Sequence, residues 1–296
     1  RSTLFPYTTL FRSSTDYLAG MPLYDSLVIA MGTAGTGGFT VYNDGIAHYN
    51  STLITYLVSF GVLTFGVNFN LYYYLLIRKF KTCFSDEELR SYLWIVFIST
   101  ALIAFNIAHL YDGFAKSVEI SFFQVSNIIT TTGFGYGDTV EWPLFAQVIL
   151  LILMCLGGSA GSTAGGFKLI RGIIIARIAK NQILSTLSSN RVLTMHVNGT
   201  VVDKDTQHKV LKYLAVYILI IVSLIFIISM DNNNFMTVVS AVLSCINNIG
   251  PMIGTTDSFS IYSPFSKVLF SLAMIAGRLE IYPILLLFLP KTWPKR

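Results

Sequence analysis

The feature that most constrains this chain is a set of long apolar stretches without a charged residue. They run from Gly45 to Ile77, Ser91 to Tyr111, Trp142 to Phe167 and Tyr213 to Met230, and a fifth, from Ser258 to Pro290, is interrupted only by Lys267, Arg278 and Glu280. Each reaches or approaches the roughly 20 residues that a helix needs to cross a bilayer. Only 12% of the 296 residues are charged, against about 25% in a typical soluble domain. The sequence therefore predicts an all-α polytopic membrane protein.

Basic residues fall into three clusters that separate the predicted spans. The clusters, at 78–90, 168–212 and 291–296, hold 15 of the 20 Lys and Arg residues, and the positive-inside rule places them in the cytoplasm. On the opposite side we count four basic residues, Arg1, Arg12, Lys116 and Lys267, against nine acidic ones, Asp16, Asp25, Asp44, Asp112, Glu119, Asp138, Glu141, Asp231 and Asp257. Such a surface is expected to concentrate cations.

Three short segments on that outer side share one pattern: DSLVIAMGTAGTGGFTVYND, SFFQVSNIITTTGFGYGDTVEWP and TVVSAVLSCINNIGPMIGTTD. Each starts with about a dozen mostly apolar residues, too few to cross a bilayer, and then becomes polar and glycine-rich. Irregular backbone at membrane depth is stable only where it is buried or lines a water-filled cavity. The predicted unit is therefore a span, a half-helix that ends inside the membrane, a glycine-rich loop and a second span. Carbonyl oxygens of several such loops can replace the water around a cation.

A second glycine-rich stretch, CLGGSAGSTAGGFKLIR at 155–171, interrupts the third span. Its GGSAG matches the G-x-S-x-G pattern of serine hydrolases around Ser159, so an intramembrane serine protease is one alternative function. That enzyme needs a histidine within reach of Ser159, and only His109 lies on a predicted span, near its outer end. A non-conducting scaffold subunit is a second alternative. The stretch does not match the phosphate-binding motif G-x-x-x-x-G-K-[ST], because Phe167 occupies the position of the required lysine.

Together, the motifs TGGF, TTTGFG, NNIGP, GGSAGSTAGGFK and AGRLEIYP resemble the Trk/Ktr/HKT superfamily of potassium transporters, and most closely its bacterial TrkH-type membrane subunit. The resemblance runs from about residue 17 to 290. It implies four helix–pore loop–helix repeats around one pseudo-fourfold ion pore. It also implies a potassium filter with Gly37, Gly133 and Gly250 at equivalent positions. The carbonyls that bind K⁺ would belong to Gly35, Thr36, Thr131, Thr132, Asn248 and Ile249.

The same resemblance makes the stretch within the third span an intramembrane loop that blocks the pore and moves to open it. The gate residues it implies are Gly157, Gly158, Ser159, Gly161, Gly165, Gly166 and Lys168 in the loop, with Arg278 in the last span. Charges inside a span are costly and usually functional. Close packing of helices through small residues is the alternative explanation for these glycines.

The first repeat and the opening helix of the second are not found, so we expect the chain to be a fragment. Residues 1–16 look like a non-native leader. We expect the second-repeat pore loop and its outer-to-inner helix at 17–82, and the third repeat with a broken final helix at 83–182. A cytoplasmic linker at 183–205, with a tight turn at Asn198–Gly199, and the fourth repeat at 206–296 complete the expected organisation.

Several further expectations follow from the resemblance alone. It implies potassium uptake across the bacterial inner membrane by a homodimer bound to a cytosolic nucleotide-binding regulatory subunit and to membrane lipid. It implies no enzyme activity, organic cofactor or nucleic-acid partner. The residues are compatible with a channel and with an ion-coupled transporter, and with preference for potassium or for sodium.

Overall fold

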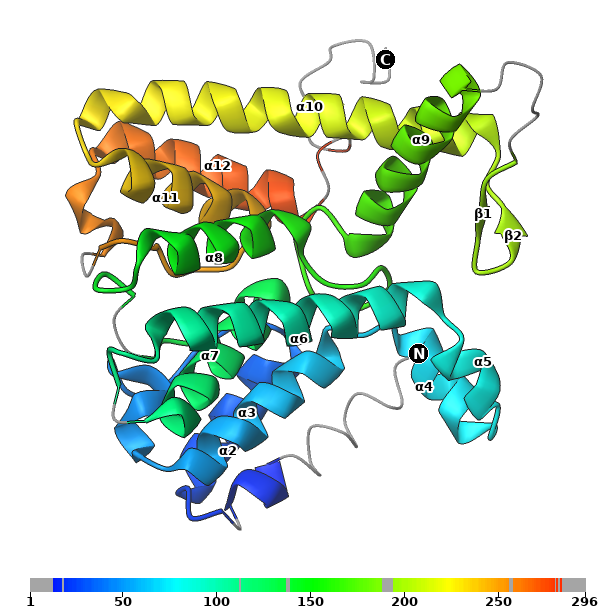
Figure 1. Ribbon diagram of the computed structural model, residues 1–296. Coiled ribbons are helices and arrows are strands. Elements are labelled where there is room, and N and C mark those ends of the chain that lie inside the picture. Colours follow the sequence, from blue (N-terminus) through cyan, green and yellow to red (C-terminus); the bar gives the residue numbers. More distant parts are fainter. Residues whose placement is uncertain are drawn as a thin grey trace, which may run out of the picture.

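The spans of the protein are helices that run back and forth between two ends of the molecule (Figure 1). The computed structural model describes residues 13–17, 19–111, 113–136, 139–187, 194–255, 258–279, 281 and 283. Its main helices are α2 (Leu23–Ala34), α3 (Thr52–Phe65), α4 (Phe69–Leu76), α5 (Phe80–Phe84), α6 (Glu87–Ile107), α7 (Phe114–Ile129), α8 (Leu144–Leu156), α9 (Leu169–Leu187), α10 (Lys204–Ile228), α11 (Phe235–Asn247) and α12 (Pro264–Arg278). Short 3-10 turns lie at Gly45–Tyr49, Ser229–Asp231 and Phe259–Ile261.

Among the described residues, two helices are individually long and apolar enough to cross a membrane: α6, and α10 with the 3-10 turn that extends it to Asp231. Helices α3 and α4 pass the same test only as a pair, and they are bent by 94° relative to each other. The apolar stretch at 45–77 is therefore not one straight helix. The helix ends at Gly66, and the side chain of Asn68 accepts a hydrogen bond from the Asn70 N–H (2.9 Å) and so starts a new helix.

The break predicted inside the third span is present. Helix α8 ends at Gly157, which has a φ of +69°, a value that residue types other than glycine rarely adopt. Residues 157–168 are irregular, and α9 then begins at Leu169. We call residues 157–168 the intramembrane segment.

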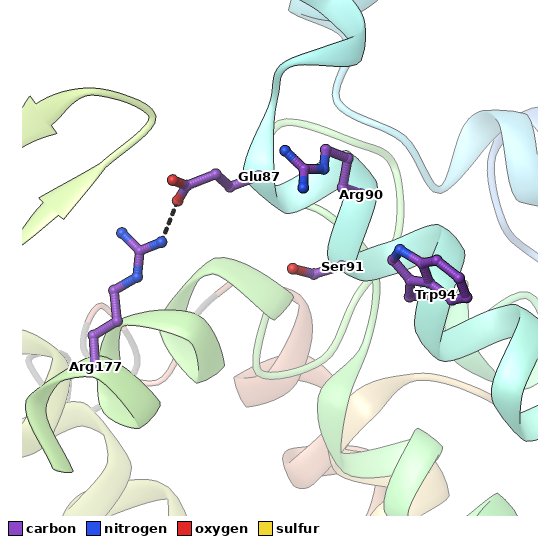
Figure 2. A pocket seen from close by; sticks show the side chains of 5 residues that line it. All are labelled: Glu87, Arg90, Ser91, Trp94 and Arg177. Carbon is purple, nitrogen blue, oxygen red and sulfur yellow. Dashed lines mark hydrogen bonds and ion pairs between the residues drawn. The ribbon is translucent and has the colours of Figure 1, made fainter. Parts of the chain in front are cut away.

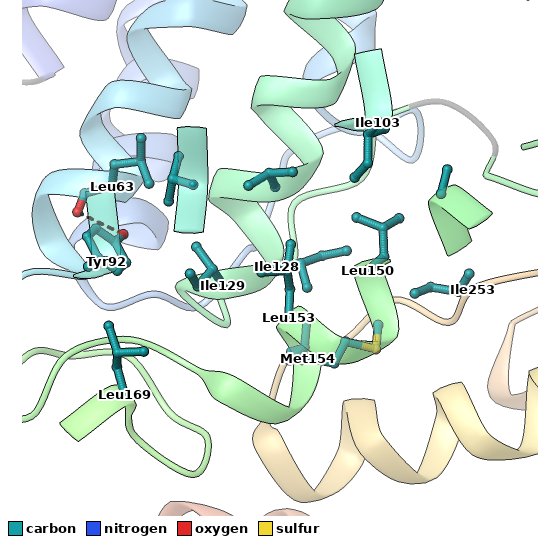
Figure 3. Packing of buried hydrophobic residues seen from close by; sticks show 14 of the residues in the cluster. Leu63, Tyr92, Ile103, Ile128, Ile129, Leu150, Leu153, Met154, Leu169 and Ile253 are labelled. Atoms are coloured by element: carbon teal, nitrogen blue, oxygen red, sulfur yellow. Dashed lines mark hydrogen bonds between the residues drawn. The ribbon is translucent and has the colours of Figure 1, made fainter. Parts of the chain in front are cut away.

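The three predicted half-helices correspond to α2, α7 and α11. Helices α7 and α11 are largely buried by protein: α7 packs against α3, α6 and α8, and α11 packs against α12, α10 and α8. Figure 3 shows part of the core between α7 and α8, in which Ile128 of α7 lies near Leu150 and Leu153 of α8. This packing holds a short helix at membrane depth where its length alone could not.

The basic segments gather at one end of the molecule. In Figure 1, α5, α9 and the first turns of α6 and α10 lie to the right, whereas the turns after α6 and α10 lie to the left. This arrangement agrees with the first two predicted cytoplasmic clusters. The third, at 291–296, lies outside the described residues.

A small hairpin at the basic end modifies the all-α prediction. Strand β1 (His196–Val197) pairs with β2 (Thr200–Val201) through a turn in which Asn198 and Gly199 have φ of +51° and +75°. An Asn-Gly pair suits this turn because both positions require positive φ. The turn was predicted, but the strands were not. The linker predicted at 183–205 is also shorter, because α9 continues to Leu187 and α10 starts at Lys204.

Close contact between α11 and α12 generates the first testable prediction. A methyl group at Gly277 would lie 1.8 Å from the Ile246 carbonyl oxygen, so Gly277→Ala must push the helices apart. We expect it to lower the free energy of unfolding by about 1–3 kcal/mol. Gly172→Ala in α9 is the matched control, because its methyl would meet nothing nearer than 3.9 Å. Thermal unfolding of the purified protein in detergent measures both. Equal unfolding temperatures for the two variants would contradict the close packing.

Candidate ion-path site

All three half-helices end in the same backbone motif. The residue that leaves each helix has left-handed φ: Thr36 (+48°), Thr131 (+55°) and Asn248 (+55°). Two hydrogen bonds close each end: Thr36 N to Thr33 O (3.1 Å) and Gly37 N to Gly32 O (2.7 Å); Thr131 N to Ile128 O (3.0 Å) and Thr132 N to Asn127 O (3.0 Å); Asn248 N to Cys245 O (3.2 Å) and Ile249 N to Ser244 O (2.9 Å). This is the Schellman pattern of helix termination. The repeat inferred from sequence is therefore a repeat in backbone geometry.

The left-handed residues are unusual because two of them are threonines. Glycine usually occupies this position, and a β-branched residue with positive φ is strained. The Thr36 hydroxyl donates to the Thr163 carbonyl (3.0 Å), and the Thr131 hydroxyl oxygen accepts from the Gly165 N–H (2.6 Å). Both strained threonines thus hold the intramembrane segment, and strain of this kind concentrates at functional sites.

Alignment on this motif corrects the predicted register of the first loop. Two residues after the left-handed residue stand Gly38, Gly133 and Gly250, with φ of +67°, +80° and +109°. Gly37 was predicted as their equivalent, but positive φ occurs at Gly38 instead. The sequence could not show which of the two adjacent glycines, Gly37 or Gly38, is the equivalent one, because only their φ angles distinguish them. Gly35, predicted to bind K⁺, is the right-handed residue that ends α2 (φ −83°) and lies before the loop. The residues in the equivalent positions are Thr36 and Gly37, Thr131 and Thr132, and Asn248 and Ile249.

Neighbouring loops lie in direct backbone contact. A methyl group at Gly38 would lie 2.1 Å from the Thr132 carbonyl oxygen, and one at Gly133 would lie 1.6 Å from that of Ile249. No side chain fits at either place, so glycine is required here for space as well as for φ. The loop after α7 is therefore packed between the other two.

The intramembrane segment contacts all three half-helix ends. Besides its bonds to Thr36 and Thr131, it brings Gly165 so close to the end of α11 that a methyl group there would lie 2.6 Å from the Asn247 carbonyl oxygen. Arg278, at the end of α12, donates from Nη1 to the Thr163 carbonyl (3.3 Å). The gate residues predicted from widely separated motifs are thus brought together.

On its other side the segment follows the bend between α3 and α4. Ser159 N donates to the Gly66 carbonyl (3.0 Å), and Phe69 N donates to the Gly161 carbonyl (3.1 Å). Lys168 donates from Nζ to the Ala164 carbonyl within the segment. These bonds satisfy backbone groups that the broken helices leave unpaired. Glu280, two residues after Arg278 in the sequence motif, lies outside the described residues.

Ser159 does not have the surroundings of a nucleophile. Its side chain is 1% exposed, and its hydroxyl has no hydrogen-bond partner among the described residues. A serine nucleophile needs a base within hydrogen-bond reach. The geometry therefore argues against the serine protease.

Fewer of the outer acidic residues reach the surface than the sequence suggests, because several of them are buried. Asp16, Asp25 and Glu119 are only 1%, 4% and 3% exposed. Asp25 accepts a hydrogen bond from the Tyr49 hydroxyl (2.8 Å), and Glu119 forms an ion pair with Lys116 (2.9 Å). Asp25 in α2 and Glu119 in α7 are therefore buried and paired, and they do not add to an acidic outer surface. Asp112, Asp138 and Asp257 lie outside the described residues.

Comparison with known proteins identifies the fold and the family. A family model described as TrkH, cation transport protein, matches residues 3–295. The chain belongs to the TrkH family. The potassium uptake protein TrkG of Escherichia coli is 33% identical over 280 residues, which cover 93% of this chain and 58% of the relative. TrkH of Salmonella typhimurium is 31% identical over 284 residues, covering 94% and 58%.

A solved structure agrees with this assignment. The crystal structure of the potassium transporter TrkH from Vibrio parahaemolyticus matches with a TM-score of 0.90 at 26% identity, covering 97% of this chain and 63% of that one. The fold is therefore that of a polytopic membrane protein of the TrkH family. The chain spans about 58% of the length of the curated relatives described above.

Polar side chains inside the half-helices were missed by the sequence analysis. Asn127 holds the loop after α7 through both amide atoms: Oδ1 accepts from Phe134 N (2.9 Å) and Nδ2 donates to Phe134 O (2.5 Å). In the next repeat, the Ser244 hydroxyl accepts from Gly250 N (2.9 Å). The available signal was a buried polar residue in the last turn or two of an apolar half-helix, because such a group needs a partner.

The corrected register of this TrkH-family loop can be tested with two neighbouring glycines. Gly38→Ala combines positive φ with a backbone clash, and we expect it to cost about 2 kcal/mol or more of folding stability. Gly37→Ala is the control, because its methyl would meet only the exposed Phe39 ring, at 3.2 Å. We expect it to cost less than about 1 kcal/mol. A larger loss of thermal stability for Gly37→Ala would restore the original register.

Proposed function

We propose that this chain forms part of a pathway for potassium uptake across the bacterial cytoplasmic membrane. One observation carries the proposal: a single strained backbone motif ends three half-helices, and the loops that follow are in mutual contact. The two curated relatives named above are potassium uptake proteins by name, and the solved structure is that of a potassium transporter. Potassium is therefore the cargo that we assign.

The chemistry of the loops suits a dehydrated cation. The C-terminal end of a helix carries a partial negative charge, equivalent to roughly half an elementary charge, and three half-helices end at this site. The carbonyls of Thr36 and Gly37, Thr131 and Thr132, and Asn248 and Ile249 are the oxygens that we assign to the filter. Backbone carbonyls select cations by replacing the hydration shell.

We assign the gate to the intramembrane segment. It is bonded directly to the two strained threonines, so a displacement of the segment acts at the inner end of the filter. Five glycines between 157 and 166 give this stretch a backbone that can change conformation. Arg278 adds a positive charge on the same side, which opposes the passage of a cation in a desolvated setting.

The assembly is part of the same proposal. We propose a homodimer in membrane lipid, with a cytosolic nucleotide-binding subunit at the basic end, where α9 and the hairpin lie. A charged, mostly helical surface that holds a hairpin is suited to a protein partner. Co-purification of the chain, completed to the length of its relatives, with that subunit tests this assignment.

Cation selectivity tests the filter. In the completed chain, potassium should raise the unfolding temperature more than sodium does, because a ligand bound to the folded state stabilises it by about 2.7 kcal/mol at 100 times its Kd. Gly133→Ser should abolish this difference and weaken potassium over sodium discrimination in flux measurements, because the side chain displaces the Ile249 carbonyl. Identical stabilisation by both ions in the unsubstituted protein would favour a non-conducting scaffold.

Arg278 tests the gate. Arg278→Ala removes both a positive charge and the bond to Thr163, so flux per inserted molecule should rise several-fold while selectivity is retained. Arg278→Lys keeps the charge and should stay nearer to the unsubstituted flux. Shortening the intramembrane segment should act in the same direction as Arg278→Ala. If both the alanine variant and the shortened variant insert normally into the membrane but show reduced flux, the gate assignment is wrong.

A further inference from the structure

A buried carboxylate contacts the intramembrane segment near its start and also the first turn of α9, which follows the segment. Glu88 lies in the first turn of α6 and is 5% exposed. One oxygen, Oε1, accepts hydrogen bonds from the Ala160 N–H (2.8 Å) and the Ile170 N–H (3.2 Å). Ala160 lies near the start of the segment, and Ile170 lies in the first turn of α9, directly after it. We propose that Glu88 is a positioning residue that fixes the closed conformation of the intramembrane segment.

The two bonded N–H groups explain why a carboxylate is needed. The first four N–H groups of a helix have no partner within it, and the Ile170 N–H is one of them. The Ala160 N–H belongs to irregular backbone and also lacks a helical partner. An ionised carboxylate accepts stronger hydrogen bonds than a neutral group does, and the positive N-terminal end of α9 favours its charge. Removal of this acceptor leaves two buried donors unpaired.

The start of α6, which carries Glu88, is held in place by hydrogen bonds. Its neighbour Asp86 caps α6 by accepting from Leu89 N (2.8 Å), and its other oxygen accepts from Asn198 Nδ2 at the tip of the hairpin (2.7 Å). Asn198 Oδ1 in turn accepts from Glu87 N (2.8 Å). The start of α6 is thereby attached to the cytoplasmic hairpin. Because its helix start is fixed in this way, the Glu88 carboxylate can hold the segment in one place.

Glu87 provides a contrast one residue away. Its carboxylate turns outward and pairs with Arg177 of α9 at 2.5 Å (Figure 2). Its side chain is 34% exposed and lines a pocket with Arg90, Ser91, Trp94 and Arg177, whereas Glu88 does not line this pocket. Adjacent carboxylates thus have separate partners. Glu87 has no hydrogen bond to the segment, which makes it a matched control.

The role of Glu88 deepens the proposed gate and rests on it, so the experiment separates the two. It uses the chain completed to the length of its relatives, with Cys83, Cys155 and Cys245 replaced by alanine and Ser162→Cys as a reporter in the segment. The rate of labelling by a thiol reagent from the cytoplasmic side reports release of the segment. Flux of potassium, measured on the same preparations, reports opening of the path.

Glu88→Ala should raise the labelling rate about tenfold or more, since the loss of a charge-assisted hydrogen bond corresponds to at least such a factor. Glu88→Gln, which keeps one acceptor oxygen, should give an intermediate rate. Glu87→Gln removes the same charge from the same helix turn and should leave labelling within about twofold, the range expected of a partly exposed ion pair. Potassium over sodium selectivity should be unchanged in all three, which a general loss of structure would not allow.

The labelling rate and the flux together distinguish the role of Glu88 from the role of the gate. Faster labelling with raised flux supports both the Glu88 assignment and the gate. Faster labelling with unchanged flux supports Glu88 as the positioning residue and overturns the gate. Unchanged labelling in Glu88→Ala overturns the inference. If that variant fails to insert, the labelling rate of Glu88→Gln relative to Glu87→Gln decides in the same way.

Discussion

Every polar backbone group at membrane depth must be hydrogen-bonded, and this requirement governs the structure. An unpaired group in hydrocarbon costs several kcal/mol, yet this chain breaks its helices repeatedly within the membrane. The broken ends are satisfied in two ways. The three half-helix ends close on themselves through paired hydrogen bonds. The intramembrane segment then bonds to Thr36 and Thr131 on one side and to the bend after α3 on the other.

The same requirement explains where the conformational strain lies. Thr36 and Thr131 adopt a conformation that glycine would adopt more easily, but glycine has no hydroxyl. Their side chains bond the intramembrane segment, and a glycine could not do so. The strain is thus offset by contacts that join the ends of α2 and α7 to the intramembrane segment. Asn248 shows a different solution, because its amide donates to the Met274 carbonyl (3.0 Å) and joins its loop to α12.

Much of the architecture was readable from the sequence because membrane depth sets segment lengths. A dozen apolar residues followed by glycines cannot span a bilayer, so the half-helices and the broken third span were predictable. The bend after α3 was not, because residues 45–77 contain no charge and only the Asn68 side chain starts the new helix. The choice between Gly37 and Gly38 depends on a dihedral angle that two adjacent glycines do not reveal. Glu88 was hidden for another reason: its partners are backbone N–H groups, which leave no signature in the side chains around them.

The contact between the loops has a consequence for how the proposed filter can change. The glycine of one loop faces the carbonyl oxygen of the next, at Gly38 against Thr132 and at Gly133 against Ile249. Each loop therefore forms part of the wall against which its neighbour rests. The aperture of the proposed filter cannot be widened at one loop while the others stay in place. Its size is a collective property, and evolution of this filter toward a different ion would require compensating changes in adjacent repeats at once.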